Sequence, residues 1–171
     1  ALLRAMAQNM AARRTVSGAS TLSTQVIRMV ERRPRTLLAK GIEVFRALQM
    51  ETHLTKREVL SQYLNRAPFG SNIAGIEAAS RRYFGKCAQD LSLAEAALLA
   101  GLPQAPSRFR PDRHFARAKK RQGYVLDRMA ACGMISEAQR AQAAAQPLRL
   151  CRSPYPFRAP HFCDLALAEG L

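Results

Sequence analysis

The sequence of 171 residues contains no tryptophan, and aromatic residues of all kinds make up only 6% of it. It also has few of the alternating β-branched runs that half-buried strands require. Alanine and leucine dominate instead, and 48% of the residues are hydrophobic. That content can bury a core in one domain, which excludes an unfolded chain. We therefore predict an all-α domain.

Membrane spans and metal-ligand patterns are also missing. The sequence has no run of 18 apolar residues and no signal peptide. No two cysteines have the spacing of a zinc site or redox motif, and the three histidines show no ligand spacing. We interpret the cysteines as core or incidental residues, although four cysteines would permit disulfides in an oxidising compartment. Those cysteines are Cys87, Cys132, Cys151 and Cys163.

Acidic residues are scarce. The chain has 27 Lys and Arg against 12 Asp and Glu, for a formal net charge of +15. Among the first fifty residues the only acids are Glu31 and Glu43. Such a field favours a polyanion, an anionic membrane surface or a phosphate-bearing substrate, without choosing among them.

A segment of small and hydroxylated residues, 17–20, precedes an apolar-periodic segment and predicts the start of a helix. The unpaired amides at that end would suit a polar or anionic ligand. Thr21, Gln25 and Arg28 follow at spacings of four and three and share one helical face. They could line a phosphate or sugar site, but an ordinary polar face of a half-buried helix has the same spacing.

A second helix is predicted from about residue 36 to residue 53. Glu43 projects away from its main apolar stripe, onto a face of small, weakly polar residues, and is therefore a candidate for a cleft. A surface pair with Lys40 or Arg46 is the alternative. We expect the apolar stripe to face the core; its members are Leu38, Ile42, Phe45 and Leu48.

The later segments predict helices separated by short loops, with a loop at 65–72 and a buried central helix ending at Leu102. A basic amphipathic helix follows over 113–132. Prolines become dense from Pro147 onward, which predicts a domain over residues 1–146 and a linker leading into a further region over 147–171.

Four segments follow one another along the chain: GASTLSTQ (18–25), KGIE with RALQME (40–51), KREVLSQYLN with FG (56–70) and LSLAEAALLAGLP (91–103). In type and order they resemble the second to fifth motifs of glycosyltransferase family 51, the peptidoglycan polymerases. The resemblance covers about residues 1–145. The variants RAPFG (66–70) and PQAPS (103–107) are most similar to the 1C type of bifunctional class A penicillin-binding proteins.

The resemblance implies a lysozyme-like helical glycosyltransferase domain on the periplasmic face of the inner, cytoplasmic membrane, with an anchor upstream. Its substrate would be lipid II, a disaccharide-pentapeptide on undecaprenyl pyrophosphate. A general-base glutamate in the family's first motif activates the acceptor hydroxyl, which attacks the anomeric carbon of the growing chain with inversion. Glu43 matches a second glutamate, which assists departure of the pyrophosphate.

By the same resemblance, Ser20, Thr21, Gln25 and Arg28 match positions that line the sugar and phosphate site, and Lys40 is the lysine of the third motif. Expected partners are lipid II, the growing glycan strand, the membrane surface and other cell wall synthesis proteins, but no nucleic acid. No cofactor is evident. A divalent cation assists some members at the pyrophosphate, although no ligand set is visible here.

The sequence departs from the family in two places. The first motif, E-D-x-x-F-x-x-H-x-G, is absent, so we expect an N-terminally truncated fragment that is inactive alone. Arg28 stands where the family usually has a lysine. Arginine retains the positive charge and can in addition bind an anion through two N–H groups at once. Ala39 stands where the family has an arginine, and Arg35, one helical turn earlier, could substitute. A transpeptidase region would lie beyond Leu171.

Two alternatives remain open at this point. The net charge and the basic cluster at 113–121 would suit a nucleic-acid-binding helical module, although no recognised motif and few stacking aromatics accompany them. Ala39 and the missing first motif would instead suit a membrane-surface scaffold that kept the fold and lost the chemistry.

Overall fold

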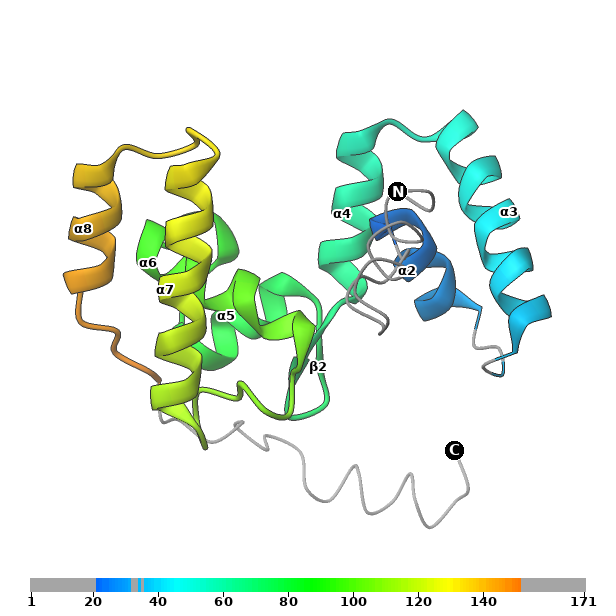
Figure 1. Ribbon diagram of the computed structural model, residues 1–171. Coiled ribbons are helices and arrows are strands. Elements are labelled where there is room, and N and C mark those ends of the chain that lie inside the picture. The colour runs from blue at the N-terminus through cyan, green and yellow to red at the C-terminus, as the bar shows by residue number, and fades with distance from the viewer. Residues whose placement is uncertain (1–20, 32–33, 35, 152–171) are drawn as a thin grey trace, which may run out of the picture.

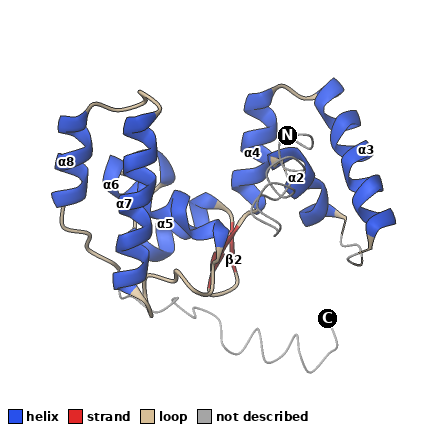
Figure 2. Cartoon of the chain, viewed as in Figure 1, coloured by secondary structure: helices blue, strands red, loops and turns tan. Residues whose placement is uncertain are grey.

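The computed structural model describes residues 21–31, 34 and 36–151 of the chain. Helices dominate these residues (Figure 2), and the predicted all-α class is confirmed apart from one small hairpin. The helices are α2 (Leu22–Val30), α3 (Leu37–His53), α4 (Lys56–Arg66), α5 (Ile76–Phe84), α6 (Leu93–Gly101), α7 (Phe115–Ala131) and α8 (Glu137–Ala145). The hairpin pairs β1 (Pro68–Gly70) with β2 (Ile73–Ala74), and two short 3-10 turns, η1 (Ala88–Asp90) and η2 (Leu102–Gln104), flank α6.

The helices form two groups (Figure 1). In the first, α2 packs against both α3 and α4; in the second, α7 packs against α6 and α8. We call residues 21–66 the N-terminal lobe and residues 67–151 the C-terminal lobe. The β1–β2 hairpin is the first part of the C-terminal lobe and lies on its side toward the N-terminal lobe (Figure 1).

Helix starts follow the capping residues that the sequence offers. The side chain of Thr21 accepts a hydrogen bond from the backbone N–H of Thr24 at the start of α2. Thr36 does the same for α3, which spans the range predicted from the sequence. Capping boxes open α4, α6 and α8 because each N-cap hydroxyl is followed three residues later by Glu or Gln.

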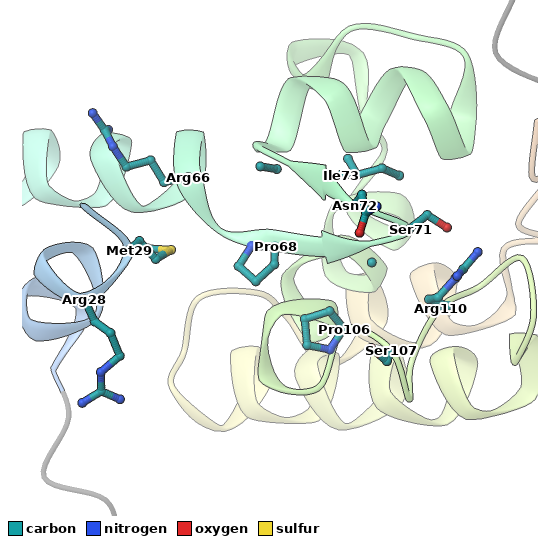
Figure 3. Close-up of a pocket in the computed structure, with 12 residues that line it drawn as sticks. Arg28, Met29, Arg66, Pro68, Ser71, Asn72, Ile73, Pro106, Ser107 and Arg110 are labelled. Atoms are coloured by element: carbon teal, nitrogen blue, oxygen red, sulfur yellow. The ribbon is translucent and has the colours of Figure 1, made fainter. Parts of the chain in front are cut away.

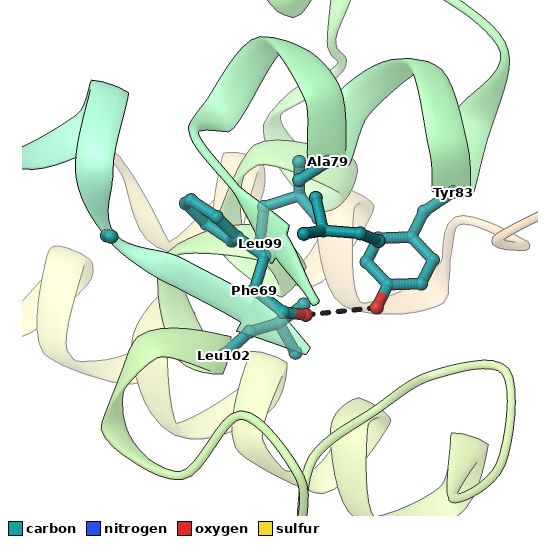
Figure 4. Packing of buried hydrophobic residues seen from close by; sticks show 7 residues of the cluster. Phe69, Ala79, Tyr83, Leu99 and Leu102 are labelled. Carbon is teal, nitrogen blue, oxygen red and sulfur yellow. Dashed lines mark hydrogen bonds between the residues drawn. The ribbon is translucent and has the colours of Figure 1, made fainter. Parts of the chain in front are cut away.

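The hydrophobic core lies mainly in the C-terminal lobe. One cluster gathers Phe69, Tyr83, Leu99 and Leu102 (Figure 4), and the Tyr83 hydroxyl donates a hydrogen bond of 2.9 Å to the Phe69 carbonyl oxygen. A second cluster joins α6, α7 and α8 around Leu126. Because α6 supplies residues to both clusters, the prediction that it is the buried centre is confirmed.

The predicted core face of α3 is wrong. Leu38 is 77% exposed, and Phe45 and Leu48 are each 60% exposed. The buried face carries Ala39, Glu43 and Ala47 instead. Small side chains let α2 approach α3 closely, so this face becomes the contact between the two helices.

The predicted division near residue 147 remains a prediction. Helix α8 ends at Ala145, after which Leu148 and Leu150 pack back against the two clusters. The backbone N–H of Cys151 donates to the Tyr83 carbonyl oxygen at 2.7 Å. None of the helices in the described part of the chain combines the length and hydropathy that crossing a membrane requires.

Candidate active site

A charged pair joins the two helices of the N-terminal lobe that carry the predicted site residues. Arg28 of α2 donates from Nε to Oε1 of Glu43 at 3.0 Å and from Nη2 to Oε2 at 2.6 Å. This fork-to-fork geometry is the strong form of the arginine–carboxylate interaction. Glu43 is therefore paired across the helix contact with Arg28, whereas Arg46 of its own helix lies 3.9 Å from Glu31.

Packing between α2 and α3 fixes this geometry. Val26 is buried on the inner side of α2, and the Ser23 hydroxyl donates to the carboxylate of Glu51 near the other end of α3. Two polar links and an apolar contact thus hold the helices in register. The register places Arg28 opposite Glu43.

Burial differs sharply between the two partners. The Glu43 side chain is 7% exposed, whereas that of Arg28 is 47% exposed. The hydrogen bonds to Glu43 raise the pKa of Arg28, so it stays charged at any physiological pH. The arrangement is a buried carboxylate behind an accessible guanidinium, which can receive a further anion on its open side.

The other predicted site residues do not join the Arg28–Glu43 hydrogen bonds. Thr21 caps α2, and Gln25 is half-buried one turn further on. Lys40 is exposed on the first turns of α3. Among the described residues, the side chains of Gln25 and Lys40 form no hydrogen bond or ion pair with another residue. Ser20 and Arg35 lie outside the described residues.

Beside Arg28 a cavity of about 760 Å³ opens between the lobes (Figure 3). Arg28 and Met29 line it from α2, and Arg66 lines it from the end of α4. The β1–β2 hairpin forms another wall, and the loop from Pro106 to Arg110 closes the remaining side. The cavity therefore extends the Arg28–Glu43 pair into a site large enough for a sugar-sized ligand.

Two arginines of this cavity, Arg66 and Arg110, received no role from the sequence. Arg66 is the last residue of α4, and Arg110 lies in a loop held by prolines. A cation in a proline-rich loop after a buried helix is the signal that could have identified Arg110. Arg66 has no such signal, because it belongs to an ordinary polar helix end.

Within residues 21–31, 34 and 36–151, no three His, Cys, Asp or Glu side chains are grouped so as to hold an ion. The carboxylate at the centre, Glu43, faces a guanidinium. A guanidinium that keeps its charge suits a phosphate oxygen as a further partner.

The chain is similar to known proteins over most of its length. The model of the Transglycosylase family matches residues 1–130. Penicillin-binding protein 1C of Escherichia coli is 46% identical over 167 residues, covering 98% of this chain but 22% of that protein. Penicillin-binding protein 2D of Bacillus subtilis is 39% identical over 158 residues, covering 90% of this chain and 23% of that protein.

A solved structure is also similar. The crystal structure of penicillin-binding protein 1A from Haemophilus influenzae superposes with a TM-score of 0.59 at 35% identity, over 67% of this chain and 17% of that one. The fold is thus the lysozyme-like helical fold of a transglycosylase domain. The chain belongs to the transglycosylase family, and it spans about a fifth of the length of the penicillin-binding proteins that it matches.

Proposed function

We propose that the protein containing this chain is a peptidoglycan glycosyltransferase that polymerises lipid II into glycan strands during cell wall biogenesis. The observation that carries the proposal is the Arg28–Glu43 fork at the edge of the inter-lobe cavity. By the motif resemblance, Arg28 matches a position that lines the sugar and phosphate site, and Glu43 matches the glutamate that assists departure of the pyrophosphate.

In the proposed reaction, an acceptor sugar hydroxyl attacks the anomeric carbon of the lipid-linked chain from the face opposite the pyrophosphate. The new C–O bond forms as the bond to the pyrophosphate breaks, so configuration inverts and the bonding electrons leave with undecaprenyl pyrophosphate. Negative charge grows on that group, and the fixed charge of Arg28 stabilises the transition state more than the ground state.

Glu43 gives Arg28 its orientation in this scheme. Its two oxygens hold Nε and Nη2, which fixes the guanidinium plane and leaves Nη1 for a phosphate oxygen. The hydroxyl proton passes to a general base in the family's first motif, which these 171 residues do not contain. We propose that the 171 residues alone are therefore inactive.

The remaining parts of the proposal follow from the family. The domain would face the periplasm from the inner membrane, bind lipid II and the growing strand at the membrane surface, and work with other cell wall synthesis proteins. No cofactor is part of the proposed step, although a divalent cation could accompany the pyrophosphate.

The test is lipid II polymerisation by the full-length protein with Glu43→Gln. We expect kcat to fall about a hundredfold, because an amide cannot hold the guanidinium as a carboxylate does, while KM changes little. Glu137→Gln on the surface of α8 is the matched control and should retain wild-type turnover. Unchanged turnover in the Glu43 variant would remove this residue from the mechanism.

The same assay separates the enzyme from a scaffold. A wild-type full-length protein that binds lipid II but releases no polymer would favour the scaffold. Salt-dependent submicromolar binding of an oligonucleotide, with no affinity for lipid II, would favour the nucleic-acid module instead.

A further inference from the structure

Arg110 is held rigidly at the cavity. Its Nε donates to Oδ1 of Asp112 at 3.1 Å and its Nη2 to Oδ2 at 2.6 Å. The stem of Arg110 lies against Gly70, where a Cβ would come within 2.7 Å of the Arg110 Cγ. Gly70 also has a φ of +92°, which side-chain-bearing residues rarely adopt. Glycine at position 70 therefore leaves the space that the Arg110 side chain occupies.

This arrangement leaves part of the guanidinium free. Asp112 engages Nε and Nη2, and among the described residues Nη1 has no hydrogen-bond partner. The bonds to Asp112 raise the pKa of Arg110, so the group stays charged. Asp112 thus fixes the arginine much as Glu43 fixes Arg28, with one edge held and one edge available.

The two held arginines lie at different ends of the same cavity. Figure 3 shows Arg28 on the α2 side and Arg110 beside Ser71, with Pro68 and Pro106 between them. No carboxylate belongs to the lining, and its third cation, Arg66, lies toward the Arg28 end (Figure 3). The other lining residues are uncharged. A ligand that fits this pattern has an anionic group at each end and an uncharged segment between them.

The hairpin turn next to Arg110 is a tight one. Ser71 and Asn72 have φ values of 51° and 58°, the left-handed backbone that a two-residue hairpin turn requires at both central positions. The turn places Ser71 beside Arg110 at this end of the cavity (Figure 3).

We propose that Arg110 is a specificity-determining residue that binds a carboxylate of the substrate's stem peptide while Arg28 binds the pyrophosphate. This inference rests on the proposed function, because lipid II carries its pyrophosphate and its peptide at different positions of the same uncharged sugar ring. Arg110 takes no part in bond breaking. Its contribution belongs to binding, and so to KM.

The experiment compares two substrates with the full-length protein. One is lipid II with free peptide carboxylates, and the other is lipid II in which each peptide carboxylate is a carboxamide. We expect the wild-type KM to be about tenfold higher for the amidated lipid, the effect of losing one charge-assisted fork. Binding of the two lipids in detergent should show the same ratio without turnover.

Substitutions locate the effect. Arg110→Gln should raise KM for the acidic lipid about tenfold, leave kcat unchanged and leave KM for the amidated lipid as in wild type. Arg110→Lys keeps the charge without the fork and should fall between the two. Arg108→Gln is the matched control, since Arg108 stacks on Phe109 outside the cavity lining and should change nothing.

Several results would overturn the inference. Equal binding and equal KM for the two lipids in wild type would do so without any variant. An equal loss on both lipids in Arg110→Gln would show a structural role; if that variant does not fold, the wild-type comparison and Arg110→Lys decide. Binding with the expected ratio but no polymer would overturn the proposed function alone.

Discussion

At the scale of single residues, Arg28 and Glu43 act as one unit. Arg28→Met should therefore lower kcat/KM for lipid II about a hundredfold, and Arg28→Lys about tenfold, because lysine keeps the charge and loses the fork. The variant carrying both Arg28→Met and Glu43→Gln should be no slower than the worse single variant. Additive losses in a double-mutant cycle would show that the two side chains act independently.

How far the site could be read from the sequence also depends on single residues. Helical spacing put Thr21, Gln25 and Arg28 on one face and separated Glu43 from its apolar neighbours, because spacing is a local property. The partner of Glu43 was not predictable from local spacing, because Arg28 lies on a different helix, α2, and meets Glu43 where α2 packs against α3. Family resemblance supplied the roles, which stay predictions.

At the scale of elements, a carboxylate at the start of α6 should make the folded chain less stable as the pH falls into the acid range. Burial by itself raises the pKa of Glu95. Hydrogen bonds from the Ser92 amide and Lys86 lower it by more than burial raises it, so the pKa of Glu95 is below its usual value. Such a group stabilises the fold above its unfolded pKa, and that stabilisation is lost as pH falls through the folded pKa.

The measurement is the free energy of unfolding between about pH 5 and about pH 3, a window that spans the ordinary carboxyl pKa and extends below it. Wild type should lose more stability over this interval than Glu95→Gln, whose side chain does not titrate. Lys86→Met, which removes the partner cation at 2.9 Å, should lie between them. Parallel curves for wild type and Glu95→Gln would mean that Glu95 is not the titrating group.

Elements whose signals are local were predicted, and those that depend on contacts were not. The capping residues Thr55 and Ser92 identified two helix starts because a cap is a local hydrogen bond. The β1–β2 hairpin was assigned to a loop, since its turn residues Ser71 and Asn72 lack the glycine that announces such turns. The orientation of α3 was wrong because hydrophobicity alone cannot show which face α2 covers.

At the scale of the whole molecule, the two lobes should differ in local stability. Both hydrophobic clusters are built from buried residues between Ala67 and Ala143, whereas α3 carries several exposed leucines. Opening of a segment costs less where fewer apolar contacts are buried. In the chain of 171 residues, amides of α6 and α7 should exchange with deuterium about a hundredfold more slowly than those of α3.

Peptide-resolved hydrogen exchange followed by mass spectrometry makes this comparison. The exposed helix α8 provides the internal control, because it belongs to the C-terminal lobe yet has only Ala143 buried. Intermediate protection is expected there. Uniform protection across both lobes would instead show that the chain opens as a single cooperative unit.

The pairing of Arg28 with Glu43 has a consequence for the end of the reaction cycle. In the proposed reaction, a diphosphate would bind the open edge of a guanidinium whose charge Glu43 already partly balances. The net attraction for the spent diphosphate would therefore be weaker than that of an unpaired arginine. A fixed counter-charge of this kind would shorten the residence time of the product and favour turnover over tight product capture.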